Sequence, residues 1–485
     1  MEKETNVSNN PNKPHVVCIP YPSQGHITPM LHLAKLLHSK GFQITFFNSD
    51  HNHSCIQNSR GPTALVGSPT FRFLTFSDGL PHSQTRLPRP TMSLMRSLEC
   101  NSYDIFKGLL VKLTETSSEM APVSVIVTDP ILLFHLDVAR DFVDCPVVLF
   151  TPSTPSSFLA HSQADTLLDR GVLPFKDPEF MTNGSLDARL DLEPASMKGM
   201  RLRDLPSQVR TRDKNSHVFK YMKQVMLRCY NRPIIFNTFK ALDHEVLEDL
   251  SKVFHGPIYT IGPLHCLSNN LTQQQIDIKS NILKEDLDYL EWLDSQNPNS
   301  VIYASFGSTT IMTKEQLIEF AWGLANSKRP FLWVVRPDIV IGQSAILPVE
   351  FENGVKGRGL ILSWCPQEKV LNHPSIAVFL THCGFNSMLE STSNGVPVIC
   401  WPYQGDNQSL GWLSCYKWGI GVELDIFVKR DIIEKRIKEV LDEEKGKKLK
   451  IKAMEWKKLV KEATSINGSS NLDLNRFIDY VRSLN

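Results

Sequence analysis

Short apolar runs alternate with segments of helical periodicity along most of the chain. The run HVVCIP (His15 to Pro20) precedes a glycine-containing turn, and PMLHLAKLLHSKG then places its apolar residues at helical spacing. Gly41 ends this predicted helix, and FQITFFNSD continues as a strand. A strand, a helix and a strand in this order predict two parallel strands joined by a right-handed crossover.

The same order recurs downstream. The segments VSVIVTD (Val123 to Asp129), LLFHLDVARDF and CPVVLFTPS predict a strand, a helix and a strand. A second series begins near Ser300 with the buried strand SVIYASFGS, and Thr313 to Gln316 form a capping-box pattern that opens a helix to about Lys328. The segments FLWVVRP, GLILSW and VFLTH follow as strands. Both halves are therefore predicted to be doubly wound α/β domains.

The length and the composition of the connections divide the chain. Its 485 residues exceed one ordinary domain, and the segment HCLSNNLTQQQIDIKSNILKEDLDYLEWLDSQNPN is polar, as an exposed connection with one short helix would be. We expect five parts: a disordered tail at 1–13, an N-terminal domain at 14–264, a linker at 265–299, a second domain at 300–468, and a C-terminal helix at 469–485 that packs back on the first domain.

Charge and composition narrow the class of partner. Lysine and arginine total 52 against 51 aspartate and glutamate, so neither nucleic acid nor an anionic membrane is expected as a general partner. No apolar run approaches the roughly 20 residues that span a bilayer, and the N-terminus lacks the apolar core of a secretion signal. The 10 cysteines contain no Cys-x-x-Cys pair, which argues against a zinc or redox site. We expect a cytoplasmic monomer without stable membrane insertion.

The strongest chemical unit is VFLTHCGFNSMLESTSNGVPVICWP. It predicts a strand to His382, a turn through Gly384, a helix from about Asn386 and a stop at Gly395. Backbone N–H groups at such a helix start, together with Asn386 and Ser387, can hold phosphate oxygens without a metal. Many α/β proteins contain a strand, a glycine and a helix in this order, so the pattern alone favours a structural role.

The surrounding sequence decides in favour of the binding role. The segment WCPQEKVLNHPSIAVFLTHCGFNSMLESTSNGVPVICWPYQGDN (Trp364 to Asn407) resembles the signature box of plant family 1 UDP-glycosyltransferases, and the resemblance continues over nearly the whole chain from about Pro14 or His15. It implies a GT-B type fold, in which two Rossmann-like α/β domains face each other across a cleft. It also implies an inverting transfer from a UDP-sugar to a small acceptor, with no metal and no cofactor.

The resemblance further implies roles for individual residues of the box. Trp364 stacks on uracil, Gln367 contacts the nucleoside and Glu390 binds the ribose hydroxyls. Asp406 and Asn407 face the sugar. Four residues surround the diphosphate: His382, Gly384, Asn386 and Ser387.

Gly307 and Ser308 lie in the turn SFGS at the end of a second predicted strand. The resemblance places this turn beside the same phosphates, and the alternative is an ordinary β–α turn. Two strand-end loops that converge on one site favour the phosphate role.

The N-terminal half offers His26, directly after the first strand in PYPSQGHITPM. Imidazole titrates near neutral pH and can accept the proton of an acceptor hydroxyl. A lone histidine here would more often cap or pack, but PSQGHI resembles the catalytic-histidine motif of the family. Asp129, at the end of VSVIVTD, would orient the ring; it is equally suited to cap a helix, and the family pattern favours the pair.

Two positions depart from the family pattern. Phe385 stands where the family usually has Trp, and Asn407 stands where it usually has Gln for a glucose donor or often His for galactose. Asparagine keeps the amide but withdraws it by one methylene, which lengthens a direct hydrogen bond or inserts a water. UDP-glucose remains the favoured donor, and UDP-xylose and UDP-galactose stay open.

The acceptor lies outside the box. The segments RLRDLPS and LWVVRPDIVIGQSAILP look similar to subgroups that glucosylate terpenoids, iridoids and cyanohydrins. Apolar residues near Ser93 to Ser102, Pro152 to Phe158 and Phe180 to Met200 suggest an apolar pocket, although ordinary core would look the same. We expect a hydroxyl or carboxyl of a terpenoid or iridoid, with phenolic and cyanohydrin acceptors as alternatives.

Other functions fit less well. Phe385 and Asn407 raise the alternative of a catalytically weak UDP-sugar-binding protein, which the retained His26 and Asp129 oppose. A nucleotide-sugar epimerase does not explain the Trp364 box. No Gly-x-Gly-x-x-Gly follows either opening strand, SFGST is not a Gly-x-Ser-x-Gly elbow, and the ligand-rich run DHNHSC (50–55) is expected to be a solvated loop rather than a metal site.

Overall fold

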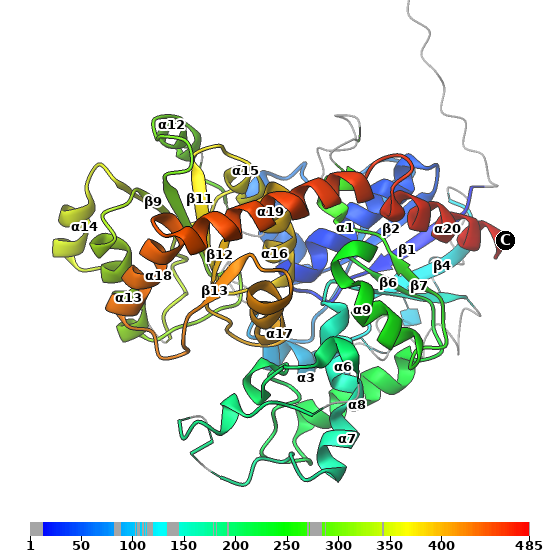
Figure 1. Ribbon diagram of the computed structural model, residues 1–485. Coiled ribbons are helices and arrows are strands. Elements are labelled where there is room, and N and C mark those ends of the chain that lie inside the picture. The colour runs from blue at the N-terminus through cyan, green and yellow to red at the C-terminus, as the bar shows by residue number, and fades with distance from the viewer. Residues whose placement is uncertain are drawn as a thin grey trace, which may run out of the picture.

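Two parallel sheets, one in each half of the chain, organise the molecule (Figure 1). The computed structural model describes residues 13–81, 89–101, 103, 107–108, 111, 113, 120–132, 145–177, 179–180, 182–191, 194–268, 271, 284–286, 288–341 and 344–484. Residues 1–12 of the predicted tail, the helix predicted over LLFHLDVARDF from 133 onward, and residues 269–270, 272–283 and 287 of the predicted linker lie outside these residues. The prediction of two α/β units is confirmed.

The first sheet reverses its strand order between β1 and β4. Its order is β3-β2-β1-β4-β5-β6-β7, and β1 pairs in parallel with both β2 and β4. The carboxyl ends of β1 and β4 are therefore neighbours, with Ile19 opposite Thr128. The strands are β1 (His15–Ile19), β2 (Gln43–Ser49), β3 (Phe71–Phe76), β4 (Val123–Thr128), β5 (Val147–Thr151), β6 (Ile234–Phe236) and β7 (Ile258–Thr260).

The helices of this half cover the sheet with apolar faces. Met30, Leu33 and Leu37 of α1 are buried against strand residues such as Val16 and Ile44. Described helices here are α1 (Gln24–Ser39), α2 (Asp50–Arg60), α3 (Thr91–Asn101), α6 (Pro155–Ser162), α7 (Ala164–Asp169), α8 (His217–Cys229), α9 (Lys240–Ser251) and α10 (Leu264–Ser268), with 3-10 turns η2 (Ser185–Asp187), η3 (Ala195–Met197) and η4 (Leu202–Asp204).

The loop predicted at 50–55 is wrong, because this run begins helix α2. The Ser49 hydroxyl accepts a hydrogen bond from the N–H of Asn52 at 3.2 Å and so caps the helix, and Asp50 lies in the first turn, where a carboxylate is favourable. Asn52 and Cys55 are buried. Within the described ranges, no group of three histidine, cysteine or acidic side chains is placed to hold a metal ion.

The second half repeats the architecture with the strand order β10-β9-β8-β11-β12-β13. The predicted capping box is confirmed, since Thr313 Oγ1 accepts from Gln316 N and Gln316 Oε1 accepts from Thr313 N. The strands are β8 (Val301–Ser305), β9 (Phe331–Val334), β10 (Gly359–Leu362), β11 (Ile376–Thr381), β12 (Val398–Cys400) and β13 (Gly421–Glu423). The helices are α12 (Tyr289–Asp294), α13 (Lys314–Asn326), α14 (Val349–Val355), α15 (Gln367–Leu371), α16 (Phe385–Asn394), α17 (Asn407–Trp412), the π-helical η5 (Leu413–Lys417), α18 (Arg430–Leu441) and α19 (Glu444–Ala463). Among the described helices, none combines the length and apolar character needed to cross a bilayer.

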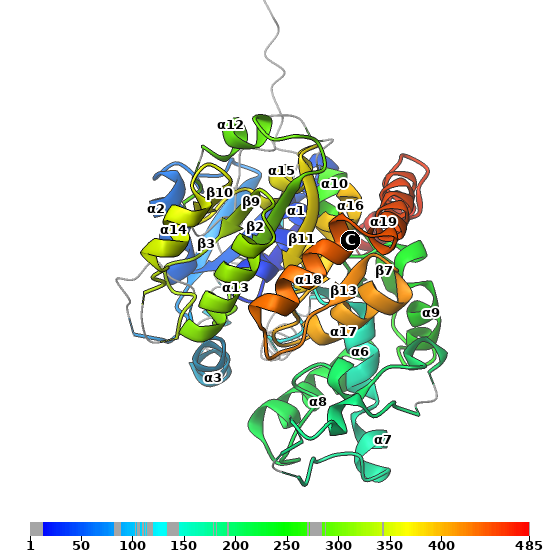
Figure 2. The same cartoon turned by 60° about the vertical axis from the view of Figure 1, so that its left-hand side comes forward.

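The segments that flank the second half, α10 before it and α20 after it, both pack on the first half. Leu264 and Leu267 of α10 belong to the core of the first half, so that half extends beyond residue 264. After α19 the chain returns to the first half as α20 (Ser469–Ser483), which lies beside β7 (Figures 1 and 2). The carboxylate of Asp473 accepts hydrogen bonds from both the N–H and the hydroxyl of Thr260, at 3.0 and 2.8 Å.

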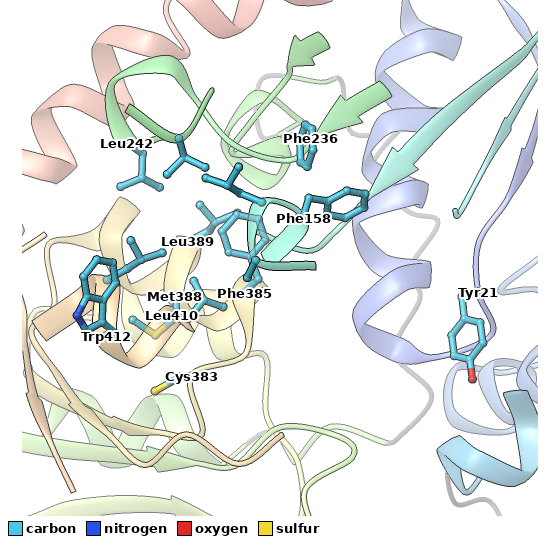
Figure 3. Packing of buried hydrophobic residues seen from close by; sticks show 14 of the residues in the cluster. Tyr21, Phe158, Phe236, Leu242, Cys383, Phe385, Met388, Leu389, Leu410 and Trp412 are labelled. Atoms are coloured by element: carbon cyan, nitrogen blue, oxygen red, sulfur yellow. The ribbon is translucent and has the colours of Figure 1, made fainter. Parts of the chain in front are cut away.

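An apolar contact joins the halves. Phe158 of α6 and Leu242 of α9 lie in one buried cluster with Phe385 and Leu389 of α16 (Figure 3). Burying apolar side chains from both halves stabilises the closed arrangement and fixes the width of the space between the sheets.

Asp473→Ala is expected to lower the free energy of unfolding. The change leaves two buried donors of Thr260 without an acceptor, at a cost of about 2–4 kcal/mol. Guanidinium titration followed by circular dichroism measures this loss. Asp479→Ala, at an exposed position of the same helix, is the control and should change stability by less than about 0.5 kcal/mol. Equal stability of the two variants would contradict the anchoring role of Asp473.

Candidate active site

A cavity of about 950 Å³ lies between the two halves. Its walls are built by the loops after β1 and β5 on one side and by the loops after β8, β11 and β12 on the other. Ligands of open α/β sheets bind at these carboxyl ends. The cavity is lined by His26 and by all the predicted donor-site residues: Gly307, Ser308, Trp364, Gln367, His382, Gly384, Phe385, Asn386, Ser387, Glu390, Asp406 and Asn407.

His26 and Asp129 form a hydrogen-bonded pair at one wall. His26 Nδ1 lies 2.6 Å from Asp129 Oδ2, and the second carboxylate oxygen accepts from the N–H of Ile131. Asp129 is 1% exposed, behind the histidine. Since Nδ1 donates to the carboxylate, Nε2 of a neutral His26 is left as a proton acceptor. The pair exists because β1 and β4 are adjacent and each residue follows the end of one of these strands.

Gly307 and His382 meet where β8 and β11 end. Gly307 has φ +69°, and a Cβ at this position would lie 2.5 Å from His382 Nε2. A Cβ on Gly384 would also lie 2.5 Å from this nitrogen, so both glycines are needed for close packing around the ring. Burial lowers the pKa of His382 to about 4, and the imidazole is therefore neutral at physiological pH.

Arg336 is a site residue that the sequence did not reveal. Its guanidinium donates to the carbonyl oxygens of Gly307 and, at 2.8 Å, of Thr310, and it pairs with Asp338 at 3.0 Å. The side chain is only 1% exposed. Arg336 thus holds the loop after β8 from behind. The only sequence signal was an arginine at the end of the predicted strand FLWVVRP.

The N-terminus of α16 points its first turn at the cavity, with Gly384 as the residue before the helix. Unpaired N–H groups of a first helical turn attract anions. The side chain of Asn386 donates to the carbonyl oxygen of Gly25 at 2.8 Å, next to His26. This contact ties the second half to the first turn of α1, which carries the histidine.

A polar network links α15 to α16. The amide nitrogen of Gln367 lies 2.8 Å from both Ser387 Oγ and Glu390 Oε2, and the hydroxyl of Tyr303 donates to its amide oxygen. Burial raises the pKa of Glu390 to about 7, while nearby His265 and the bond from Gln367 lower it. Trp364 lies shortly before Gln367 in the sequence. It lines the cavity and is half-buried. An aromatic face and a hydrogen-bonded carboxylate suit a base and its ribose.

The opposite end of the cavity holds Asp406 and Asn407 at the start of α17. Asp406 accepts a hydrogen bond from the N–H of Thr154 at 3.3 Å, and burial raises the pKa of its carboxyl. Ser207 and Gly405 exchange two hydrogen bonds of 2.8 Å just before it. Residues of the first half therefore position this end of the second half, which the sequence pattern did not indicate.

Phe385 lies in the contact between the halves. It is 4% exposed, it belongs to the cluster with Phe158, and it also reaches the cavity wall. Figure 3 shows it on the same side of α16 as Leu389. The phenyl ring of Phe385 thus helps to close the interface between the halves.

Both the sequence and the fold are similar to those of known proteins. The family described as "UDP-glucoronosyl and UDP-glucosyl transferase" matches residues 179–462. The chain is 47% identical over 475 residues to a 7-deoxyloganetin glucosyltransferase of Catharanthus roseus, covering 97% of each, and 46% identical over 473 residues to an (R)-mandelonitrile beta-glucosyltransferase of Prunus dulcis, again covering 97% of each. The chain belongs to this glycosyltransferase family.

Solved structures show the same fold for this glycosyltransferase. Os79 from O. sativa in complex with UDP superposes with a TM-score of 0.78 at 26% identity, covering 96% of this chain and 100% of that one. A UDP-glucose: anthocyanidin 3-O-glucosyltransferase in complex with UDP gives 0.81 at 25% identity, covering 98% and 100%. The GT-B type fold expected from the resemblance is confirmed.

The apolar wall predicted for the cavity of this glycosyltransferase differs in part from expectation. Met95 of the first predicted segment and Phe158 of the second line the cavity, but none of the described residues of Phe180–Met200 does, so that part of the prediction is wrong. Instead, residues 207–226 contribute a long stretch of the wall, including Met222. The amphipathic pattern of α8 predicts a buried face, but it does not predict whether that face packs in the core or lines the cavity.

Gly307→Ala should weaken UDP binding by at least about tenfold, because the new Cβ collides with His382 and the backbone has a positive φ that costs about 1–2 kcal/mol. Isothermal titration with UDP measures this loss. Gly354→Ala is the matched control, since a Cβ there meets nothing within 4 Å. Unchanged UDP affinity in Gly307→Ala would show that this loop does not border the nucleotide.

Proposed function

We propose that the protein transfers glucose from UDP-glucose, with inversion, to a hydroxyl or carboxyl of a small hydrophobic plant metabolite of the terpenoid or iridoid class. The observation that carries this proposal is the His26–Asp129 pair on the wall of a cavity that both halves line. The similarity to a 7-deoxyloganetin glucosyltransferase supports glucose as the sugar and an iridoid-like acceptor.

The proposed reaction is a single displacement. His26 Nε2 takes the proton of the acceptor hydroxyl while the oxygen attacks the anomeric carbon of the sugar. The bond from that carbon to the diphosphate breaks on the opposite face, so an α-linked donor gives a β-glucoside and UDP. Asp129 stabilises the imidazolium that forms and keeps the ring in the reactive orientation.

The second half holds the donor in this proposal. Trp364 stacks on uracil, Gln367 contacts the nucleoside and Glu390 binds the ribose. Asp406 and Asn407 contact the sugar. The diphosphate lies between the loop after β8, the loop after β11 and the first turn of α16. The residues around it are Gly307, Ser308, His382, Gly384, Asn386 and Ser387.

Charge on the departing diphosphate is stabilised by fixed dipoles. The N–H groups of α16 and the neutral imidazole of His382 face the cavity and need no rearrangement during the reaction. We therefore infer that the transfer proceeds without a metal. We also infer a cytoplasmic monomer; the ten free cysteines fit a reducing compartment.

His26→Ala should reduce transfer at least about 100-fold while UDP affinity is kept, because the change removes the base and leaves the second half intact. Product formation from UDP-glucose and a set of terpenoid alcohols is followed by mass spectrometry, and UDP binding by titration. His244→Ala, an exposed histidine on α9, is the control. Near-normal transfer by His26→Ala would contradict this mechanism.

Asn407→Gln should increase the preference for UDP-glucose over UDP-xylose and UDP-galactose by a few fold, because the longer side chain brings its amide nearer to the sugar hydroxyls. Asn407 is buried at the start of α17, beside Asp406. Competition among the three donors with one acceptor measures the preference. An unchanged donor preference and turnover would remove this position as a specificity determinant.

A further inference from the structure

The wall that residues 207–226 contribute to the cavity contains a guanidinium without a partner among the residues that the structure describes. Arg210 lines the cavity, and its Nε is buried without a hydrogen-bond partner. Its side chain makes no ion pair with any of the residues that the structure describes. Other buried or half-buried arginines of this region are paired, as Arg201 is with Asp204 and Glu423.

Arg210 remains charged in this position. Burial lowers the pKa of its guanidinium to about 10, the carboxylate of Asp204 raises it, and the charge of Arg203 lowers it further. Asp204 already accepts hydrogen bonds of 2.7–2.9 Å from the N–H and the guanidinium of Arg201. The carboxylate of Asp204 thus acts on Arg210 only at longer range, and a partly buried cation lines the cavity without a hydrogen bond or ion pair to any described residue.

The segment that carries Arg210 is fixed on both sides. Ser207 exchanges two hydrogen bonds with Gly405 of the second half, and the carbonyl oxygen of Thr211 accepts from the N–H of Phe175 at 3.0 Å. The backbone of Arg210 lies between these two anchors. A guanidinium held in this way is suited to recognise a planar group in one orientation.

Two further side chains of the cavity wall, Gln208 and His161, also have a buried polar atom without a hydrogen-bond partner, and His161 has the opposite preference to Arg210. His161 Nδ1 lies 2.7 Å from the carbonyl oxygen of Ser157 and must donate to it. Burial lowers the pKa of His161 to about 4, so its Nε2 is an acceptor, and this atom has no partner. A carboxylate would be repelled there. Around these two groups the wall includes apolar side chains of α8 such as Val225 and Met226.

We propose that Arg210 binds a carboxylate of the acceptor and that the favoured acceptor is therefore a hydroxy acid with an apolar skeleton. Its carboxylate lies at Arg210 while its hydroxyl faces His26, so the product is an ether-linked glucoside with a free acid. The paired oxygens of a carboxylate match the guanidinium fork. This inference rests on the proposed function and narrows its acceptor class.

The test compares 8-hydroxygeranic acid with its primary amide, which has nearly the same shape and no charge, as acceptors with UDP-glucose. The wild type should favour the acid in kcat/KM by at least about tenfold, as expected for a charged hydrogen bond. Its product should resist mild alkali, which cleaves glucose esters. Arg210→Met should bring the ratio of acid to amide near one through loss of activity on the acid, with UDP affinity unchanged.

Matched variants separate recognition from folding and from general charge. Arg203→Met removes the same charge from a guanidinium paired with Asp187 outside the cavity, and it should keep the wild-type ratio. Arg210→Lys should give an intermediate ratio. Thermal denaturation shows whether Arg210→Met is folded. If it is not, Arg210→Gln supplies a second neutral variant.

The outcomes distinguish a failure of this inference from a failure of the proposed function. A wild-type ratio near one, an ester product, or a ratio that survives in Arg210→Met would overturn the assignment of Arg210 while leaving glucosyl transfer to the amide intact. Weakened UDP binding in Arg210→Met would assign the guanidinium to the donor instead. Absence of transfer to both compounds and to neutral terpenoid alcohols would reject the proposed function itself.

Discussion

The site depends on the reversal of strand order in two parallel sheets. Right-handed crossovers place the helices of successive units on opposite faces of a sheet wherever the order reverses, and the loops on the two sides of that point then diverge. In the first sheet the reversal lies between β1 and β4, which brings His26 to Asp129. In the second sheet β8 and β11 are adjacent in the same way, which brings Gly307 to His382. Both crevices open toward one cavity.

Closure of the two halves adds a second constraint. The apolar cluster around Phe158 and Phe385 sets the distance between the halves, and hydrogen bonds at its edge set their alignment. The pair Asn386–Gly25 joins the first turn of α16 to the first turn of α1, and the pair Ser207–Gly405 joins two loops, both beside the cavity. A proposed base on one half and a proposed sugar site on the other can therefore face each other with little freedom. Phe385 serves this packing in the place where the family usually has tryptophan.

Burial decides the charge of the polar groups in the cavity wall. The pKa of His382 falls and that of Glu390 rises because both are desolvated, so neither adds a full charge near the proposed diphosphate and ribose. Arg336 is also buried, but it is compensated by Asp338 and by two carbonyl oxygens. Arg210 makes no hydrogen bond or ion pair with the described residues, and this difference is why we assign Arg336 to the support of a loop and propose Arg210 as a ligand-binding residue.

The sequence by itself determined the two α/β units, the capping box at Thr313 and the set of residues that line the donor side of the cavity. Strands and helices follow from hydrophobic periodicity, and the residues of the Trp364 to Asn407 box lie after the ends of β10, β11 and β12 or at the helices that follow them, so one edge of one sheet brings them together. The tertiary structure alone decided the rest. It replaced the loop expected at 50–55 with a capped helix, moved the acceptor wall from 180–200 to 207–226, and revealed Arg336 and Arg210. The cap of α2 is local, between Ser49 and Asn52, whereas the position of the cavity wall and the surroundings of the two arginines depend on contacts between segments far apart in the chain.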